Sequence, residues 1–368
     1  MKLAGNILTA DGWINGHLTI KDGLIAGINR ISGEIVTGAP CLIPGFIDLH
    51  VHGGGGYDIM QGGEAARVLA RTHARFGSTS VLATTMTAPP AAIDAAFAAV
   101  AAVRRNPPAD GADILGIHLE GPFINPEKLG AQPAYAIRAD KEFINRLNAA
   151  VPIRIITIAP EFAENLALIP WLGRQNIRVQ IGHTLADYEQ CCCALQAGAK
   201  SFTHLYNAMS PLSHRAAGAV GAALAHARYC EIIPDLVHVG KGAMRAAMRA
   251  IPRLYGITDG TAACGMPDGQ YRLGENDIYK QGNAVRLADG TLAGSVLTLD
   301  KALKNFIRLG DSLAQASHRL SAYQADYLGL QDRGRLEIGR RADLNIIDTH
   351  YNIIDTYIAG RRVVRDKD

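Results

Sequence analysis

Short apolar runs alternate with longer amphipathic stretches along most of this chain. Between residue 41 and about residue 320, eight apolar runs of strand length are separated by segments whose apolar residues recur with helical spacing. The runs are 41–52, 78–85, 112–120, 152–160, 177–184, 200–208, 229–239 and 254–259. Repeated strand and helix units indicate an α/β fold with a parallel sheet, and eight of them predict a (β/α)8 barrel of the TIM type.

A doubly wound open sheet is the other architecture that this alternation allows. That fold carries a glycine-rich phosphate loop after its first strand. The glycines at 53–56 do not form GxGxxG, and the chain has no Walker sequence. We therefore favour the barrel.

The two ends of the chain have a different pattern. Residues 1–43 and 330–368 alternate apolar and polar positions, and turn signals such as Asp11-Gly12 and Asp22-Gly23 interrupt the N-terminal part. Neither end can bury a sheet face alone. We therefore predict that the ends pair in one small β-sandwich domain, beside a barrel domain of residues 44–329.

Composition narrows the functional classes. Of the 368 residues, 48% are hydrophobic and 19% are charged, which excludes a disordered chain. A formal net charge of +3 gives no electrostatic reason to expect a nucleic-acid or membrane partner. The six cysteines, three of them consecutive at 191–193, lack the spacing of a disulfide framework or zinc finger. Because no signal-peptide core or long apolar run occurs, we expect a cytoplasmic protein.

Ionisable side chains gather at the predicted carboxyl ends of the strands, where a barrel places its chemistry. His50 and His52 share one strand face, Glu120 is a carboxylate able to bridge two ions, and His118 is either their neighbour or a packing residue. Imidazole and carboxylate together bind borderline divalent cations. The sequence predicts one or two ions, with zinc first and iron, manganese or cobalt as alternatives. The candidate ligands are His50, His52, Glu120, His183, His204 and Asp259.

The order of short motifs resembles a known family. PGFIDLHVHGGGGYD, HLEGPF, GHT, THLYNAM, DLVHV and LAGSVLTLD follow one another as in the N-acetylglucosamine-6-phosphate deacetylases of the amidohydrolase superfamily. The resemblance covers nearly the whole chain. It implies a metal-dependent, homodimeric enzyme that hydrolyses N-acetyl-D-glucosamine 6-phosphate to glucosamine 6-phosphate and acetate.

The resemblance also implies roles for individual residues. Glu120, His183 and His204 hold the main ion, and the HxH pair of the first strand allows a second. Asp259 matches the catalytic aspartate, which acts as base toward the attacking water and then as acid toward the leaving amine. The residues implied to contact the substrate are His238, Asn207, Ala208, Arg215 and Gln132, and His238 is also counted with the catalytic residues.

Departures from the family pattern all lie in substrate recognition. Gln132 stands in place of a histidine, the 214–218 loop lacks an acidic residue and a proline, and Leu236 replaces a glycine, which we expect to narrow the room near the sugar. N-acetyl-D-galactosamine 6-phosphate or another N-acyl amino sugar is therefore an alternative substrate. A cyclic-amide hydrolase is less favoured because the fourth strand ends without a lysine. A non-catalytic sugar-phosphate-binding protein is less favoured because no ligand is missing.

Overall fold

The computed structural model describes residues 1–364. All eight apolar runs contain a strand, and the first six strands join in one parallel sheet of order β12-β11-β10-β9-β8-β5. The last two strands form a separate parallel pair. The strands are β5 (Phe46–Val51), β8 (Ser78–Thr85), β9 (Asp113–Glu120), β10 (Ile153–Ile158), β11 (Arg178–Ile181), β12 (Ser201–Phe202), β13 (Tyr229–Ile232) and β14 (Arg253–Gly256).

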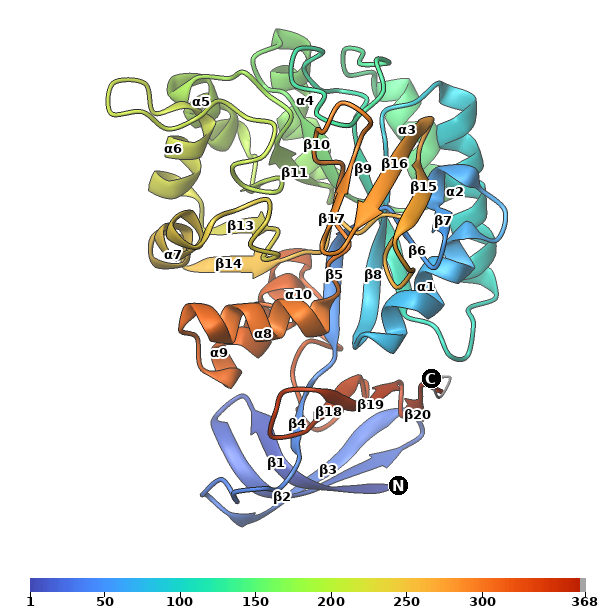
Figure 1. Cartoon of the computed structure of the whole chain (residues 1–368), viewed down its shortest axis with the longest axis vertical. Coiled ribbons are helices and arrows are strands. Elements are labelled where there is room, and N and C mark those ends of the chain that lie inside the picture. Colours follow the sequence, from blue (N-terminus) through green and yellow to red (C-terminus); the bar gives the residue numbers. More distant parts are fainter. Residues whose placement is uncertain (365–368) are drawn as a thin grey trace.

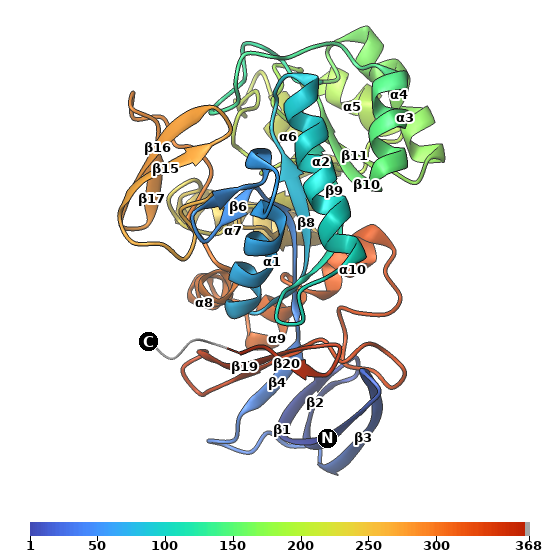
Figure 2. The ribbon, with the colours of Figure 1, turned by 90° about the vertical axis from the view of Figure 1, so that its right-hand side faces the viewer.

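Helices alternate with these strands and lie outside them (Figures 1 and 2). Strand β8 is buried at all of its positions, as expected when helices cover a parallel sheet. The helices are amphipathic; in α8, for example, Leu299, Leu303 and Phe306 are buried while Lys301 and Arg308 are exposed. They are α1 (Ala65–Arg75), α2 (Pro90–Arg105), α3 (Lys141–Ala150), α4 (Ala163–Arg174), α5 (Tyr188–Ala197), α6 (Gly218–His226), α7 (Lys241–Ala250), α8 (Leu299–Leu309), α9 (Leu313–His318) and α10 (Ala322–Leu328).

The parallel sheet curls so that its first and last strands approach each other. Val51 at the end of β5 forms a parallel bridge with Gly260, which follows β14. At the other break, the backbone N–H of Leu205 donates to the carbonyl of Glu231 on β13. The α/β fold with a curled parallel sheet confirms the predicted strand and helix alternation. Complete closure into an eight-stranded barrel stays a prediction.

Both chain ends meet in a seven-stranded sheet of order β20-β19-β18-β4-β1-β2-β3. The antiparallel pairing of β4 with β18 joins the N-terminal and C-terminal parts, and Ile7, Leu18 and Leu344 belong to a small core of their own. The ends therefore pair, but in one described sheet, so the sandwich and its boundaries stay predictions. Residues 365–368 of that predicted domain lie outside the described residues. The strands are β1 (Lys2–Thr9), β2 (Gly12–Lys21), β3 (Leu24–Ser32), β4 (Cys41–Pro44), β18 (Leu344–Ile347), β19 (Ile353–Ile358) and β20 (Arg361–Arg362).

A three-stranded antiparallel sheet that the sequence pattern did not predict follows β14. It consists of β15 (Gly269–Leu273), β16 (Asn276–Gln281) and β17 (Ala284–Arg286), and it projects from one side of the molecule (Figure 2). Short elements also follow β5: β6 (Gly53–Gly54), β7 (Tyr57–Asp58) and the 3-10 helix η1 (Ile59–Gln61). Within the described part of the chain, no helix combines the length and the hydrophobicity needed to span a membrane.

Candidate metal centre and substrate pocket

The carboxyl ends of the strands bring all six predicted metal ligands into one cluster. Three of them, His183, His204 and Asp259, have left-handed backbone angles, with φ of 48°, 30° and 50°. Such angles are uncommon outside glycine and cost about 1–3 kcal/mol each, so the surrounding structure must hold them in place. The six are His50 on β5, His52 just after it, Glu120 at the end of β9, His183 after β11, His204 after β12 and Asp259 after β14.

Glu120, His183 and His204 form the first ligand group. The Oε1 atom of Glu120 lies 3.2 Å from Nε2 of His183 and 3.0 Å from Nε2 of His204, and the two nitrogens are 3.1 Å apart. Ligand atoms placed tetrahedrally about 2.0 Å from one zinc ion are separated by roughly 3.3 Å. The spacing and the donor types of this group therefore fit a divalent cation.

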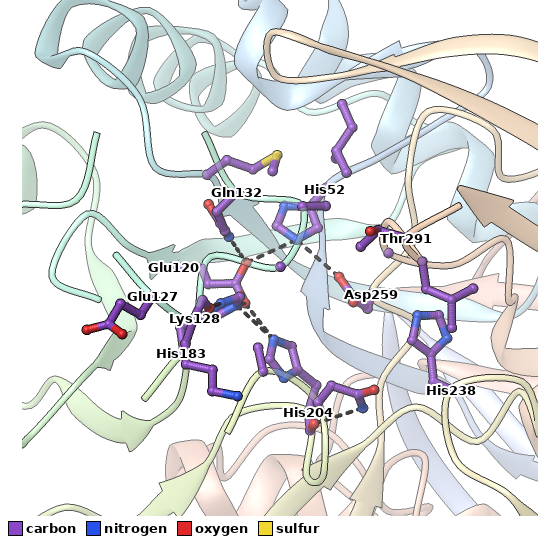
Figure 3. A pocket seen from close by; sticks show the side chains of 18 residues that line it. His52, Glu120, Glu127, Lys128, Gln132, His183, His204, His238, Asp259 and Thr291 are labelled. Atoms are coloured by element: carbon purple, nitrogen blue, oxygen red, sulfur yellow. Dashed lines mark hydrogen bonds and ion pairs between the residues drawn. The ribbon is translucent and has the colours of Figure 1, made fainter. Parts of the chain in front are cut away.

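His50, His52 and Asp259 form a second group beside the first. The Nε2 atoms of the two histidines are 3.2 Å apart, and Oδ1 of Asp259 lies 3.4 Å from His50 and 3.1 Å from His52. Glu120 reaches this group too, because its Oε2 lies 3.3 Å from Nε2 of His52 (Figure 3). Its Oε1 lies 3.4 Å from Nε2 of His50. The carboxylate of Glu120 thus lies between the two groups, as a bridging ligand requires.

Hydrogen bonds behind three of the four ligand imidazoles, those of His50, His52 and His183, orient these rings toward the cluster. A ring nitrogen facing a carbonyl or carboxylate oxygen must donate, so Nε2 is the nitrogen that points at the cluster and can bind a cation once it loses its proton. This is the arrangement found around metal-binding histidines. The Nδ1 partners are Glu231 Oε1 at 2.8 Å for His50, Thr84 O at 3.0 Å for His52 and Lys128 O at 2.8 Å for His183.

Burial and mutual charge shift the pKa values of the ligands. Burial alone raises the pKa of Glu120, but the facing imidazoles, His50 foremost, bring it well below its usual range. Burial alone lowers the pKa of His52, whereas the carboxylates of Asp259 and Glu120 raise it to about 9. The pKa of Asp259 falls to about 2 despite burial, because of His50 and His52. Both carboxylates are therefore ionised at neutral pH.

Glu231 is a functional residue that the sequence reasoning missed. It is fully buried on β13, and its Oε1 also accepts a hydrogen bond from the backbone N–H of His204 at 3.0 Å. One carboxylate thus holds metal ligands that come from two other strands. The signal in the sequence that could have revealed this role is a single acidic residue within an apolar strand.

His118, for which the sequence allows two roles, packs against His50 with ring centroids 4.6 Å apart, and burial lowers its pKa to about 3. His118 is therefore an uncharged neighbour of the ligands.

A pocket of about 370 Å³ opens in front of the cluster (Figure 3). His50 lies behind the exposed face of the cluster, and the other five ligands line the pocket. Leu273, Leu292 and Gly294 from the segment after β14 form another wall. Of the residues predicted to contact substrate, those that line the pocket are Gln132, Asn207, Ala208 and His238.

Two residues named for substrate recognition do not line this pocket. Arg215 is exposed on the segment between β12 and α6 and does not line the pocket. Leu236 lines a different pocket, so the expected narrowing near the sugar is wrong. Leu236 has a left-handed backbone with φ of 64°, and it faces the basic side chains of α8 across that other pocket.

Gln132 connects the pocket wall to the bridging carboxylate. Its Nε2 donates to Oε2 of Glu120 at 2.6 Å, and its Oε1 accepts from the backbone N–H of Thr87 at 2.6 Å. The second bond fixes which end of the amide faces Glu120. The side chain is 7% exposed and also lines the pocket. Gln132 therefore positions the metal ligand Glu120. The sequence predicted only a contact with substrate for Gln132, so this positioning role is an addition from the structure.

Replacing Gln132 with leucine is expected to weaken metal retention by about 10–100-fold, because groups that orient metal ligands have effects of that size. Metal content after dialysis against graded chelator concentrations measures this. Gln132→His keeps a hydrogen-bond donor and is expected to retain more metal than Gln132→Leu. Equal retention by the leucine variant and the unmodified protein would contradict the role.

Residues 41–363 match the family model described as the amidohydrolase family. The chain belongs to that family. Membership of the amidohydrolase family implies a divalent metal ion. Within the described residues, three groups of buried His, Asp and Glu side chains could hold one, and they include both groups described above. The prediction of a divalent metal ion is therefore confirmed, whereas the identity of that metal stays a prediction.

Relatives of this amidohydrolase share nearly its whole length. An N-acetylgalactosamine-6-phosphate deacetylase of Escherichia coli O157:H7 is 38% identical over 97% of both chains. An N-acetylglucosamine-6-phosphate deacetylase of Vibrio furnissii is 39% identical over 93% of this chain and 89% of the relative. The solved structure of an N-acetyl-D-glucosamine-6-phosphate deacetylase mutant from Mycobacterium smegmatis, in complex with N-acetyl-D-glucosamine-6-phosphate, is 32% identical and covers 99% of both chains with a TM-score of 0.92.

Proposed function

We propose that this amidohydrolase removes the acetyl group from N-acetyl-D-glucosamine 6-phosphate, giving glucosamine 6-phosphate and acetate. The observation that carries the proposal is the position of Glu120 between two imidazole groups, with Asp259 at the edge of a pocket. The named activities of the relatives support the substrate class. Zinc is the metal that we propose first, because it is commonly bound by imidazole and carboxylate, with iron, manganese or cobalt as alternatives.

The chemistry follows from the residues that face the pocket. Glu120, His183 and His204 would hold a divalent cation, which would supply Lewis acidity toward the acetamido carbonyl and would lower the pKa of a water molecule from about 16 toward about 7. Asp259, ionised at neutral pH, accepts a proton from the attacking water. It then returns this proton to the amide nitrogen as the C–N bond breaks. The sugar amine leaves, and the water oxygen is retained in acetate.

His238 is proposed to hold the sugar. Its Nδ1 lies 2.7 Å from Oδ2 of Asp235, which orients the ring and leaves Nε2 for a substrate hydroxyl or amide. Burial lowers the pKa of His238, but Asp235 outweighs burial and raises it. Asn207 and Ala208 line the same pocket, so they are available to the sugar phosphate.

The phosphate needs a cationic partner. Lys128 is the one lysine or arginine among the described residues that line the pocket. Arg215 lies outside it, so Arg215 of one subunit would reach a substrate only in the pocket of another. We therefore propose a homodimer in which Arg215 completes the phosphate site of the partner.

Arg215→Ala is expected to raise KM roughly tenfold or more for the phosphorylated substrate, because a guanidinium binds phosphate through charge-assisted, bidentate hydrogen bonds. Lys128→Ala is expected to raise KM as well. Steady-state kinetics on the sugar with and without its phosphate measure both effects. Arg245→Ala, on the exposed side of α7, is the matched control. An unchanged KM for Arg215→Ala would remove this residue from the phosphate site.

N-acetyl-D-galactosamine 6-phosphate is the second candidate substrate. The specific observation in its favour is the Escherichia coli relative of that name, which matches 97% of its own length and of this chain. A panel of N-acetyl glucosamine, galactosamine and mannosamine, each with and without 6-phosphate, tests the choice by acetate release from zinc-loaded protein. We expect the highest kcat/KM for the phosphorylated gluco substrate. A preference for the galacto epimer would select the second candidate, and no acetate release from any member would overturn the proposed function.

We further propose that the eight parallel strands close into a complete barrel. Residues 1–43 and 330–368 are proposed to form the separate small β domain, because the sheet made from both ends has its own apolar core. A cytoplasmic location remains a proposal from the sequence.

A further inference from the structure

A second pocket lies against α8, on the other side of the loop that carries His238. Its volume is about 320 Å³, which is in the range of small-ligand sites. Basic side chains of α8 form one wall, and Asp235 and Leu236 form another. Residues 296–297, which lead into α8, and the side chains of Asn283 and Asn305 complete the lining.

The α8 wall is cationic. Lys301, Lys304 and Arg308 are three and four residues apart along the helix, so they lie on one side of it. Within residues 1–364, no carboxylate forms an ion pair with any of the three. Lys304 Nζ donates to Asn352 Oδ1 at 2.6 Å, and Arg308 Nη1 donates to Asn305 Oδ1 at 3.2 Å, so both keep their full charge and further N–H groups.

Among the described residues that line this pocket, Asp235 is the one carboxylate, and its oxygens are already engaged in hydrogen bonds. Its Oδ1 accepts from the backbone N–H groups of Val237 and His238, each at 2.9 Å, and its Oδ2 lies 2.7 Å from Nδ1 of His238. The neighbouring Leu236 lines the pocket in a left-handed conformation that costs roughly 1–2 kcal/mol for a residue with a Cβ. The pocket thus presents three cations against one paired carboxylate.

Two short connections link this pocket to the reaction site. Asp235 is the hydrogen-bond partner of His238, which lines the substrate pocket. Ser295, adjacent to the wall at 296–297, donates its backbone N–H to the carbonyl of Asp259 at 2.7 Å. A ligand that moves Asp235 therefore acts on His238 through one hydrogen bond. A ligand that moves residues 296–297 acts on Asp259 through the hydrogen bond of the adjacent Ser295.

We propose that the α8 pocket binds the phosphate group of a small soluble molecule and that its occupancy changes turnover through His238 and Asp259. Phosphate matches the wall because lysine and arginine bind it through charge-assisted hydrogen bonds. The effect on turnover rests on the proposed function, whereas binding does not.

Inorganic phosphate is the probe, and its binding is measured by calorimetry on the full chain. The test variant carries Lys301→Gln, Lys304→Gln and Arg308→Gln. The matched control carries Lys241→Gln, Arg245→Gln and Arg249→Gln, which remove the same charge from the exposed side of α7.

The α8 variant is expected to bind one phosphate equivalent fewer than the unmodified protein, or to bind it about tenfold or more weakly, while the α7 control is unchanged. Phosphate is expected to change kcat in the unmodified protein and the control but not in the α8 variant. Equal phosphate binding by the α8 variant and the unmodified protein would overturn the site. If the triple variant has a lowered Tm, the single variant Lys301→Gln, at an exposed position, replaces it. Lys301→Gln is expected to weaken phosphate binding, and unchanged binding would overturn the proposed site. The binding measurement uses no substrate. Its result therefore tests the phosphate site even if the protein does not deacetylate the proposed substrate.

Discussion

Asp259→Asn is expected to lower kcat by about 10²–10⁴-fold, the usual contribution of a general acid–base group. Asparagine keeps the shape of the side chain and an oxygen that can face His50 and His52, but it cannot accept the proton of the attacking water. The left-handed φ of 50° at this position also suits asparagine, which tolerates that conformation better than most residues. The fold and the first ligand group of Glu120, His183 and His204 are therefore expected to survive, and acetate release under saturating substrate measures the loss of kcat.

Glu127→Gln is the matched control for Asp259→Asn. Glu127 also lines the pocket, but it is exposed and is not part of either ligand group. Its amide variant is expected to stay within a few-fold of the unmodified kcat. Retention of near-normal turnover by Asp259→Asn, with normal metal content in both variants, would remove Asp259 from proton transfer.

The strands and the ligand cluster are predictable from the sequence for the same physical reason. Strands that are packed on both faces carry few charged residues, so β8 has none and β9 has them only at its two ends, Asp113 and Glu120. A histidine or carboxylate directly after such a run is conspicuous, and parallel strands bring their carboxyl ends to one edge. That is why the sequence alone places His183 and Glu120 together, although they are 63 residues apart.

The features that were missed depend on partners far away in the chain. Glu231 lies inside a strand, and its role shows only in contacts that folding creates. These are a 2.8 Å contact with His50, 181 residues away, and a 3.0 Å hydrogen bond from the backbone N–H of His204. The sheet of β15–β17 is mostly exposed, so its apolar pattern is weak. One contact that fixes its position is the hydrogen bond from Gly274 N–H to Asp58 Oδ2 at 3.2 Å. The spacing of apolar residues along the chain does not indicate contacts of this kind between distant polar residues.

Glu120→Gln is expected to reduce metal affinity by at least about 100-fold, because the change removes negative charge from a ligand and not merely from a neighbour that orients one. Glu120 is the side chain that both groups share, within 3.2 Å and 3.0 Å of two imidazoles on one side and 3.3 Å of His52 on the other. Loss of the Glu120 carboxylate is expected to weaken metal binding by both ligand groups, whereas loss of the His183 imidazole is expected to weaken metal binding by the first group alone.

Thermal unfolding distinguishes metal loss from simple inactivation. An ion that binds the folded state at 100 times its Kd stabilises it by about 2.7 kcal/mol, so added zinc is expected to raise the Tm of the unmodified protein and of Glu127→Gln. The same zinc is expected to leave the Tm of Glu120→Gln nearly unchanged, with bound metal measured in parallel. A zinc-dependent Tm increase in Glu120→Gln equal to that of Glu127→Gln would show that Glu120 is not the shared ligand. In that case the two imidazole groups would have to bind their ions independently, and the bridging geometry would lose its role in hydrolysis.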